Sequence, residues 1–182
     1  ALLINKRVDG IIMSLSNESN NDFHIKEILR KEIPFVQFDK ISKLIPSSKV
    51  LINDQKAAME AVQHLIDKGC KKIAHIRGLE NPQNSIDRFI GYKKALEKNG
   101  IPFDPKLVYA CKSITFEQGV EFAKQIIMDD LGIDGIFVIT DLVAIGVLAH
   151  FNEIGIQVPN QIAIIGFSNW FMSQVITPKL ST

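Results

Sequence analysis

The sequence predicts an α/β fold in which parallel sheets are flanked by helices. One reason is a series of helical segments that each end at a glycine, at Gly69, Gly100, Gly132 and Gly155. Glycine readily adopts the left-handed conformation that ends a helix. A second reason is that a short apolar strand follows each of these glycines. Strands that alternate with helices and are connected to them by short loops are expected to run parallel, with right-handed crossover connections.

Apolar residues spaced three or four apart define the four helices. The first helix follows Asn53 and Asp54, the third opens with a capping box at 115–118, and the fourth follows Asp141. We expect the following side chains to face the core, helix by helix: Ala58, Ala61, Val62, Leu65 and Ile66; Phe89, Tyr92 and Leu96; Phe116, Val120, Ala123 and Ile127; and Ala144, Val147, Leu148 and Phe151.

The four predicted strands are residues 72–76, 107–111, 135–139 and 162–167. Short apolar runs of this kind are typical of central strands that are covered on both faces. The last strand ends abruptly in Ser168, Asn169 and Trp170. Ligands of open α/β sheets bind outside the carboxyl ends of the strands. We therefore expect a small molecule to bind at this tip.

Residues 1–52 differ from the rest of the chain. They contain the end of a helix, a strand at 10–15, a helical stretch at 22–31, a strand at 35–39 and a polar loop at 40–48. A sheet of two or three strands with one helix cannot cover both of its faces. We predict that residues 1–52 are the remnant of an N-terminal subdomain, which is incomplete, and that residues 53–182 form a C-terminal subdomain.

Composition and charge exclude several classes of protein. The chain has 182 residues and a net charge of +1 from interspersed acids and bases, so it has no basic block to bind nucleic acid by itself. No apolar run reaches the ~18 residues of a membrane span and no secretory leader is present, so we expect a cytoplasmic protein with no membrane partner. Cys70 and Cys111 are isolated, which argues against a disulfide framework or a zinc site.

The usual signatures of catalysis and cofactor binding are absent. There is no GxGxxG after a strand, no GxxxxGKS/T and no HExxH. The run 166–170 resembles the GxSxG nucleophile elbow of hydrolases, but Trp170 stands where the last glycine allows close packing. We predict that the chain is not an enzyme, has no catalytic residues and needs neither a cofactor nor a metal.

Six stretches of the chain carry a family resemblance. They are "VDGIIMSLS", "IPFVQFDK", "AVQHLIDKGCKKIAHIRG", "SIDRFIGYKKALEKNGI", "DGIFVITDLVAIGVLAHFNEIGIQVPNQIAIIGFSN" and "PKLST". The most specific patterns within them are HLIxxGxxxIAxIxG, SxxRxxGY, and ExGxxVP leading into IxGF. In this order, the stretches resemble the effector-binding core of the LacI/GalR family of bacterial transcription regulators.

The resemblance implies a two-subdomain, periplasmic-binding-protein-like fold of type I. It implies that a small effector, a carbohydrate or a sugar phosphate, is held between the subdomains. It further implies a homodimer in which the effector favours one orientation of the subdomains and thereby controls binding to operator DNA. The helix-turn-helix headpiece that binds DNA in this family is absent from this chain, which is expected to be truncated at both ends.

The resemblance also assigns effector-binding positions. Arg88 lies where the family places an arginine that binds adjacent sugar hydroxyls; the alternative is a helix-surface arginine in an ion pair. Asp39 and Ser14 match polar cleft positions, and the alternative for both is a strand-end turn former. The other expected effector contacts are Asn84, Ile114, Thr140, Ser168, Asn169 and Trp170.

Three positions depart from the family pattern or have a different expected role. Ser168 stands where the family often has an aspartate. Ile114 stands where many members have an aromatic residue that stacks on the effector, so Phe116 or Trp170 is expected to supply an apolar platform. We expect Asp141 to cap its helix and to touch no ligand.

Two other functions stay open at the level of sequence. A periplasmic sugar-binding protein of a transport system shares the fold and differs in its compartment. A sugar-processing enzyme needs a paired acid and base in the cleft, and the sequence offers Asp39 with nothing convincing opposite it.

Overall fold

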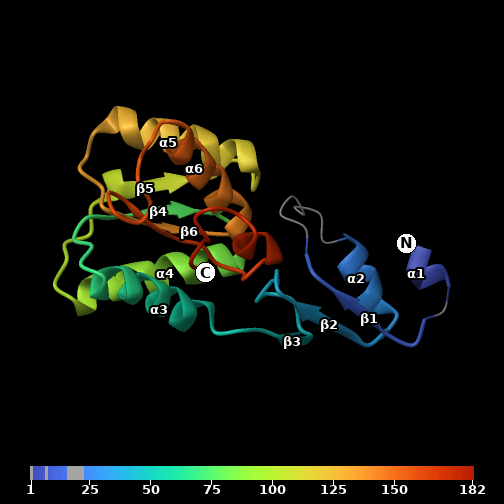
Figure 1. Cartoon of the computed structure of the whole chain (residues 1–182). Coiled ribbons are helices and arrows are strands. Elements are labelled where there is room, and N and C mark those ends of the chain that lie inside the picture. Colours follow the sequence, from blue (N-terminus) through green and yellow to red (C-terminus); the bar gives the residue numbers. More distant parts are fainter. Residues whose placement is uncertain (1, 7, 16–22) are drawn as a thin grey trace. The chain divides into compact units, whose positions relative to one another are not determined.

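The computed structural model describes residues 2–6, 8–15 and 23–182. The chain divides into two compact units (Figure 1). Unit 1 comprises Ala1–Asn53 and Asn81–Asn84, and unit 2 comprises Asp54–Glu80 and Ser85–Thr182. No helix within the described ranges has both the length and the apolar character needed to cross a membrane.

Unit 1 contains a small parallel sheet with the strand order β1-β2-β3. Its elements are α1 (Leu2–Asn5), β1 (Ile11–Met13), α2 (Phe23–Arg30), β2 (Phe35–Phe38) and β3 (Ser48–Val50). The strands and the helix predicted here are confirmed, although the predicted start of α2, Asp22, lies outside the described residues. The predicted polar loop ends in a third strand, β3, which pairs with β2.

The loop that leads into β3 is held by a buried glutamine. Gln37 of β2 is fully buried. Its Nε2 donates to Ser47 Oγ at 2.6 Å, and its Oε1 accepts from the backbone N–H of Ser42 at 2.9 Å. A buried amide must find partners of this kind because an unsatisfied one is costly. The polar side chain therefore orders a loop that has no regular structure.

Unit 2 is a four-stranded parallel sheet with the order β5-β4-β6-β7. All four predicted strands and all four predicted helices are confirmed. The elements are α3 (Asp54–Asp67), β4 (Ile73–Arg77), α4 (Gln83–Lys98), η1 (Pro105–Leu107), β5 (Val108–Ala110), α5 (Phe116–Asp129), β6 (Gly135–Val138), α6 (Asp141–Glu153), β7 (Ala163–Ile165) and η2 (Phe171–Gln174).

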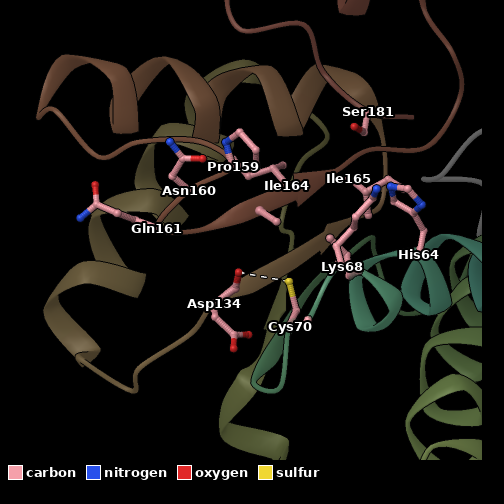
Figure 2. Close-up of a pocket in the computed structure, with 13 residues that line it drawn as sticks. His64, Lys68, Cys70, Asp134, Pro159, Asn160, Gln161, Ile164, Ile165 and Ser181 are labelled. Atoms are coloured by element: carbon pink, nitrogen blue, oxygen red, sulfur yellow. Dashed lines mark hydrogen bonds between the residues drawn. The ribbon is translucent and has the colours of Figure 1, made fainter.

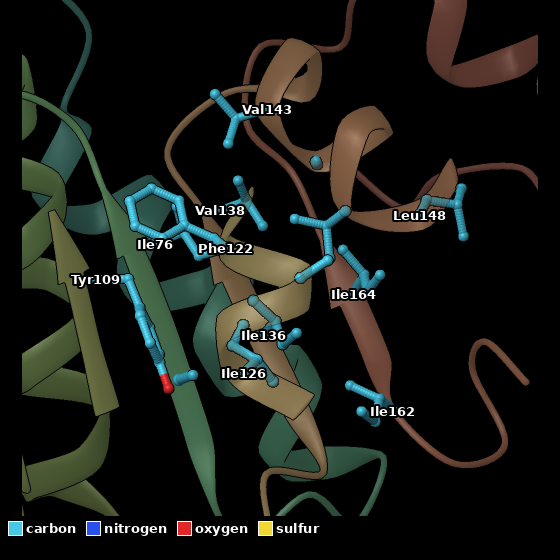
Figure 3. Packing of buried hydrophobic residues seen from close by; sticks show 14 of the residues in the cluster. Ile76, Tyr109, Phe122, Ile126, Ile136, Val138, Val143, Leu148, Ile162 and Ile164 are labelled. Atoms are coloured by element: carbon cyan, nitrogen blue, oxygen red, sulfur yellow. The ribbon is translucent and has the colours of Figure 1, made fainter. Parts of the chain in front are cut away.

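The helices of unit 2 cover both faces of its sheet (Figure 1). Helices α5 and α6 lie against one face, and α3 and α4 lie against the other. Alternate strand residues supply the two cores, so that Ile136 and Val138 of β6 join the cluster under α5 and α6 (Figure 3), whereas Phe137 joins the cluster with α3 and α4. Burial on both faces explains why these strands are continuous apolar runs.

The face of α5 that meets the core differs from the prediction. Phe116 and Ile127, predicted to be buried, are 37% and 40% exposed, whereas Phe122 is buried. The reason is a close glycine contact between α5 and α6. A Cβ at Gly119 would lie 2.1 Å from the carbonyl oxygen of Val143. The backbones of α5 and α6 therefore approach each other closely at glycines. The spacing of apolar residues in the sequence does not reveal a contact of this kind.

The helix ends agree with the sequence in most details. All four predicted glycines have positive φ angles between 67° and 98°. Thr115 is the N-cap of α5, and its Oγ1 accepts from the N–H of Gln118 at 3.2 Å. The C-cap of α5, however, is Asp130 in the left-handed conformation, two residues before Gly132.

Polar groups inside unit 2 use strand carbonyls as partners. Tyr92 Oη donates to the carbonyl of Ile73 at 2.8 Å. His75 is fully buried, stacks on the ring of Phe137 at 4.7 Å, and donates from Nδ1 to the carbonyl of Phe137 at 3.0 Å. Burial lowers the pKa of His75 to about 3, so the ring is neutral in the folded chain.

Candidate functional site

A hollow of about 520 Å³ lies at the carboxyl edge of the sheet of unit 2. Three strand ends contribute to it, since Ile114 follows β5, Thr140 follows β6 and Ser168 follows β7. The lining residues are Ile114, Thr140, Leu142, Ser168, Asn169, Trp170 and Phe171. The structure thus brings together five of the nine predicted effector contacts.

Two lining residues, Leu142 and Phe171, were not predicted. Leu142 is the second residue of α6, and its apolar neighbours in the sequence suggested a core position. Phe171 begins η2, is 66% exposed, and packs edge-on against Trp170 with ring centroids 5.5 Å apart. An aromatic pair next to a strand end was a signal for Phe171, because exposed aromatic residues often cover ligands.

The rim of this hollow has an unusual backbone. Ser168 has a φ angle of 129° and Asn169 one of 49°. Residues other than glycine rarely adopt such values, and asparagine tolerates them better than serine does. Strained residues of this kind cluster at functional sites, where the surrounding structure holds them in place.

Thr140 lines the hollow, but its hydroxyl is buried, and Oγ1 has no hydrogen-bond partner within the part of the chain that the structure describes. Thr140 is also the N-cap of α6, without a side-chain capping bond. The prediction that Asp141 caps α6 is therefore wrong, because Asp141 is the first residue of the helix. Its carboxylate instead accepts from the N–H of Trp170 at 2.7 Å.

Arg88 does not line this hollow. It is buried on α4, where Nε donates to Asp54 Oδ1 at 2.8 Å and Nη1 donates to the carbonyl of Ile139 at 2.8 Å. Its guanidinium also stacks over the ring of Phe167 at 3.8 Å. Asp54 is the first residue of α3, and Ile139 directly follows β6, so Arg88 connects α4 to both of these elements. Whether it also touches an effector stays a prediction.

The other predicted contacts belong to unit 1. Ser14 follows β1 and Asp39 follows β2, and both are exposed at the carboxyl edge of that small sheet. Ser14 Oγ accepts from the N–H of Lys40 at 3.4 Å. Asp39 has a φ angle of 54° and accepts from Asn84 Nδ2 at 3.3 Å. Both the ligand role and the turn role remain compatible with this geometry.

A second hollow, of about 490 Å³, lies beside β7 (Figure 2). Two of its polar side chains, Cys70 and Asp134, bond to other parts of the chain. Cys70 Sγ donates to the carbonyl of Asp134 at 3.4 Å, and burial raises the pKa of this thiol. The Asp134 carboxylate accepts from the N–H groups of Lys71 and Lys72, both at 2.8 Å. Because Cys70 and Asp134 precede their strands, this hollow extends to the amino ends of the sheet, and the carboxyl-edge hollow is the better candidate for a ligand.

The carboxyl-edge hollow has the chemistry of binding. It presents the amide of Asn169 and an exposed indole, together with the hydroxyl of Ser168, which also donates to the carbonyl of Phe167, while the hydroxyl of Thr140 is buried behind the lining. In the described ranges, no group of three or more histidine, cysteine or acidic side chains is arranged to hold a metal ion. Hydroxyl and amide groups can form hydrogen bonds with the polar edge of a small molecule while a neighbouring aromatic ring packs against its apolar face.

Comparison with known proteins identifies the family. Residues 62–182 match the model of the periplasmic binding protein-like domain. The chain belongs to this family. The predicted LacI/GalR effector-binding core and the predicted parallel α/β architecture are both confirmed.

The relatives are transcription regulators. Catabolite control protein A of Priestia megaterium is 34% identical over 99% of this chain, and the match covers 54% of that protein. The structure of the transcription regulator CcpA of Lactococcus lactis superposes with a TM-score of 0.88 at 30% identity, covering 98% of this chain and 64% of that one. A LacI family regulator from Enterococcus faecium, solved with bound ribose, has a TM-score of 0.85 at 28% identity, covering 99% and 66%. The chain thus spans about half the length of the curated relative.

Proposed function

We propose that this chain is the effector-binding and allosteric module of a LacI/GalR-type transcription regulator. The observation that carries the proposal is the hollow at the carboxyl ends of β5, β6 and β7, where Thr140, Ser168 and Asn169 lie beside the indole of Trp170. The similarity to regulators supports this function over that of a periplasmic transport protein. It also supports a binding role without catalysis.

The effector we propose is a neutral carbohydrate. The residues that line the hollow include no lysine, arginine, aspartate or glutamate, and the charge of nearby Arg88 is already paired with Asp54, so no unpaired cation among the described residues is available for a phosphate there. The Enterococcus faecium regulator, which binds ribose, supports a sugar. In this proposal, the Trp170 ring covers the apolar face of the sugar while the hydroxyl of Ser168 and the amide of Asn169 bind its hydroxyl groups. The buried, unpartnered hydroxyl of Thr140 is proposed to turn towards the sugar when it binds.

Four further residues are proposed as effector contacts. Arg88 is proposed to turn part of its guanidinium towards the sugar while it keeps its bond to Asp54. Ser14, Asp39 and Asn84 are proposed to supply polar groups from unit 1. Each of these contacts rests on the family resemblance, and each predicts that an alanine substitution weakens sugar binding by about ten-fold or more.

The proposed mechanism is a shift between conformations. Sugar binding favours one arrangement of the effector core, and this arrangement sets the affinity of a DNA-binding headpiece for operator DNA. The site of action is then the cytoplasm. A homodimer is also proposed, since dimers are typical of the family to which the chain belongs.

Calorimetry on the intact regulator tests the ligand class. We expect ribose, glucose or another neutral sugar of a small panel to bind, and glucose 6-phosphate to bind more weakly. Trp170→Ala should weaken binding by about ten-fold or more, because the stacking face is lost. Phe103→Ala, which removes a half-exposed ring from another surface of unit 2, should leave it unchanged. Equal affinity of wild type and Trp170→Ala would refute this assignment.

Gel-shift titration tests the regulator function. The intact protein should bind the promoter next to its gene, and the bound sugar should change that affinity. The 182-residue chain should show no sequence-specific binding, because its charges alternate and specific DNA recognition needs several phosphate contacts from basic residues. Selective binding by the 182-residue chain would place the DNA-reading surface in a different part of the protein.

A further inference from the structure

Asp141 is a fully buried acid behind the wall of the candidate site. Its Oδ2 accepts from the N–H of Trp170 at 2.7 Å, and its Oδ1 accepts from Thr182 Oγ1 at 2.7 Å. Its own N–H donates to the carbonyl of Phe167 at 3.2 Å. One residue therefore contacts the segment before the wall, the wall itself and the end of the described chain.

Thr182 extends this set of bonds to the strained part of the wall. While its hydroxyl donates to Asp141, its Oγ1 also accepts from the N–H of Asn169 at 3.0 Å. The two N–H groups that follow Ser168 are thus held by one carboxylate and one hydroxyl. Positive φ angles at Ser168 and Asn169 persist only where surrounding contacts hold them, and these bonds are such contacts.

The sequence makes room for Asp141 at a glycine. A Cβ at position 166 would lie 2.2 Å from Asp141 Oδ1, so only glycine allows the carboxylate this close to the end of β7. The N–H of Gly166 donates to the carbonyl of Ser181 at 2.8 Å, which brings the segment that carries Thr182 beside β7. The close approach therefore joins Gly166, Asp141 and Thr182 in one packed unit.

We propose that Asp141 is a positioning residue that holds the Ser168–Asn169–Trp170 wall in its strained form. Because the same carboxylate binds Thr182, it also links the wall to the segment 181–182. Asp141 acts on the effector through the wall and does not touch it. The consequence for sugar binding rests on the function proposed above, whereas the effect on the wall does not.

The single tryptophan of the chain provides a direct readout, since Trp170 is part of the wall. Acrylamide quenching of Trp170 fluorescence measures how freely the wall opens. In the 182-residue chain, Asp141→Ala removes both acceptor oxygens and should raise the quenching constant by about two-fold, because a loop without these bonds opens locally. Asp141→Asn keeps one acceptor oxygen and can donate to Thr182 Oγ1, so it should stay close to wild type.

The matched control is Asp134→Ala. Asp134 also accepts from two backbone N–H groups, those of Lys71 and Lys72, but it lies beside the second hollow. Asp134→Ala should lower the melting temperature without changing Trp170 quenching. A general loss of structure would raise quenching in both alanine variants, which would overturn the proposal, as would unchanged quenching in Asp141→Ala.

Calorimetry with ribose on the intact regulator separates this inference from the proposed function. Asp141→Ala should weaken ribose binding by about ten-fold, and Asp141→Asn should restore most of it. If wild type binds none of the sugars, the proposed function fails, and the quenching order of the three variants still decides the positioning role. If wild type binds ribose and Asp141→Ala binds it equally well, the positioning role fails and the proposed function stands.

Discussion

Removal of the Arg88 guanidinium should destabilise unit 2 strongly. The Arg88–Asp54 ion pair has a 2.8 Å contact, and the two side chains are only 9% and 11% exposed. Removal of one member of a buried pair costs about 3–5 kcal/mol, because the remaining charge is left without its partner. Arg88→Ala also removes the bond to the Ile139 carbonyl and the stacking on Phe167.

Thermal unfolding followed by far-UV circular dichroism measures this effect. In a chain of this size 1 kcal/mol corresponds to about 2–4 °C, so Arg88→Ala should lower the melting temperature by roughly 6–20 °C. Arg88→Lys keeps the charge but cannot reach both acceptors, and it should lose about 1.5–3 kcal/mol. Glu60→Ala, which breaks an exposed pair with Lys56 at 3.7 Å, should change stability by less than about 1 kcal/mol.

A double-mutant cycle isolates the ion pair. Arg88→Ala and Asp54→Ala should each be destabilising, and the double variant should be less destabilised than their sum by about 0.5–3 kcal/mol. A coupling energy of zero, or a melting temperature of Arg88→Ala within about 2 °C of wild type, would refute the structural role. In that case the Arg88–Asp54 pair would add nothing to the stability of the fold, and effector binding would be the one role still predicted for Arg88.

Three more predictions concern the core of unit 2. The pKa of His75 is lowered from 6.5 to about 3, so the neutral ring contributes its full stability above about pH 6.5, and this stability is lost as the pH falls towards 3, at up to about 1.4 kcal/mol per pH unit. Urea unfolding at several pH values should therefore show that the stability of His75→Phe depends less on pH than that of wild type. Parallel curves for the two proteins would contradict this. Gly146→Ala puts a Cβ 2.1 Å from the Phe116 carbonyl oxygen and should lower the free energy of unfolding by about 1–3 kcal/mol. The control Lys124→Ala, at an exposed position, should leave the free energy of unfolding unchanged. Burial raises the pKa of Cys111 to about 12, so iodoacetamide at pH 8 should leave it unmodified in the folded chain by mass spectrometry, and rapid labelling would show that the core around it opens.

Local patterns in the sequence were enough to predict most of the architecture. Helix-ending glycines and short apolar strands predicted the order and direction of the strands in unit 2, because each of these signals lies within a few residues of the element it defines. The wall at Ser168, Asn169 and Trp170 was predicted for the same reason, since a polar tip on a buried parallel strand marks the ligand edge of the sheet.

Features that depend on contacts between residues far apart in the sequence were not predicted. The inward face of α5 is set by Gly119 against α6, and apolar periodicity does not detect a contact made by glycines. The partner of Arg88, Asp54, lies 34 residues away in sequence. The role of Asp141 depends on Trp170 and Thr182, which are 29 and 41 residues away, so its position before a helix suggested a cap instead.

Hydrogen exchange with bound sugar tests the central claim most directly, because it locates the ligand without assuming a mode of binding. The intact regulator is compared with and without a neutral sugar that calorimetry shows to bind, at a concentration that saturates the protein. The account predicts slower exchange in peptides that contain residues 140–142 and 168–171, and no change in peptides that cover 64–70 and 159–161, which line the second hollow. Protection confined to residues 64–70 and 159–161 would contradict it.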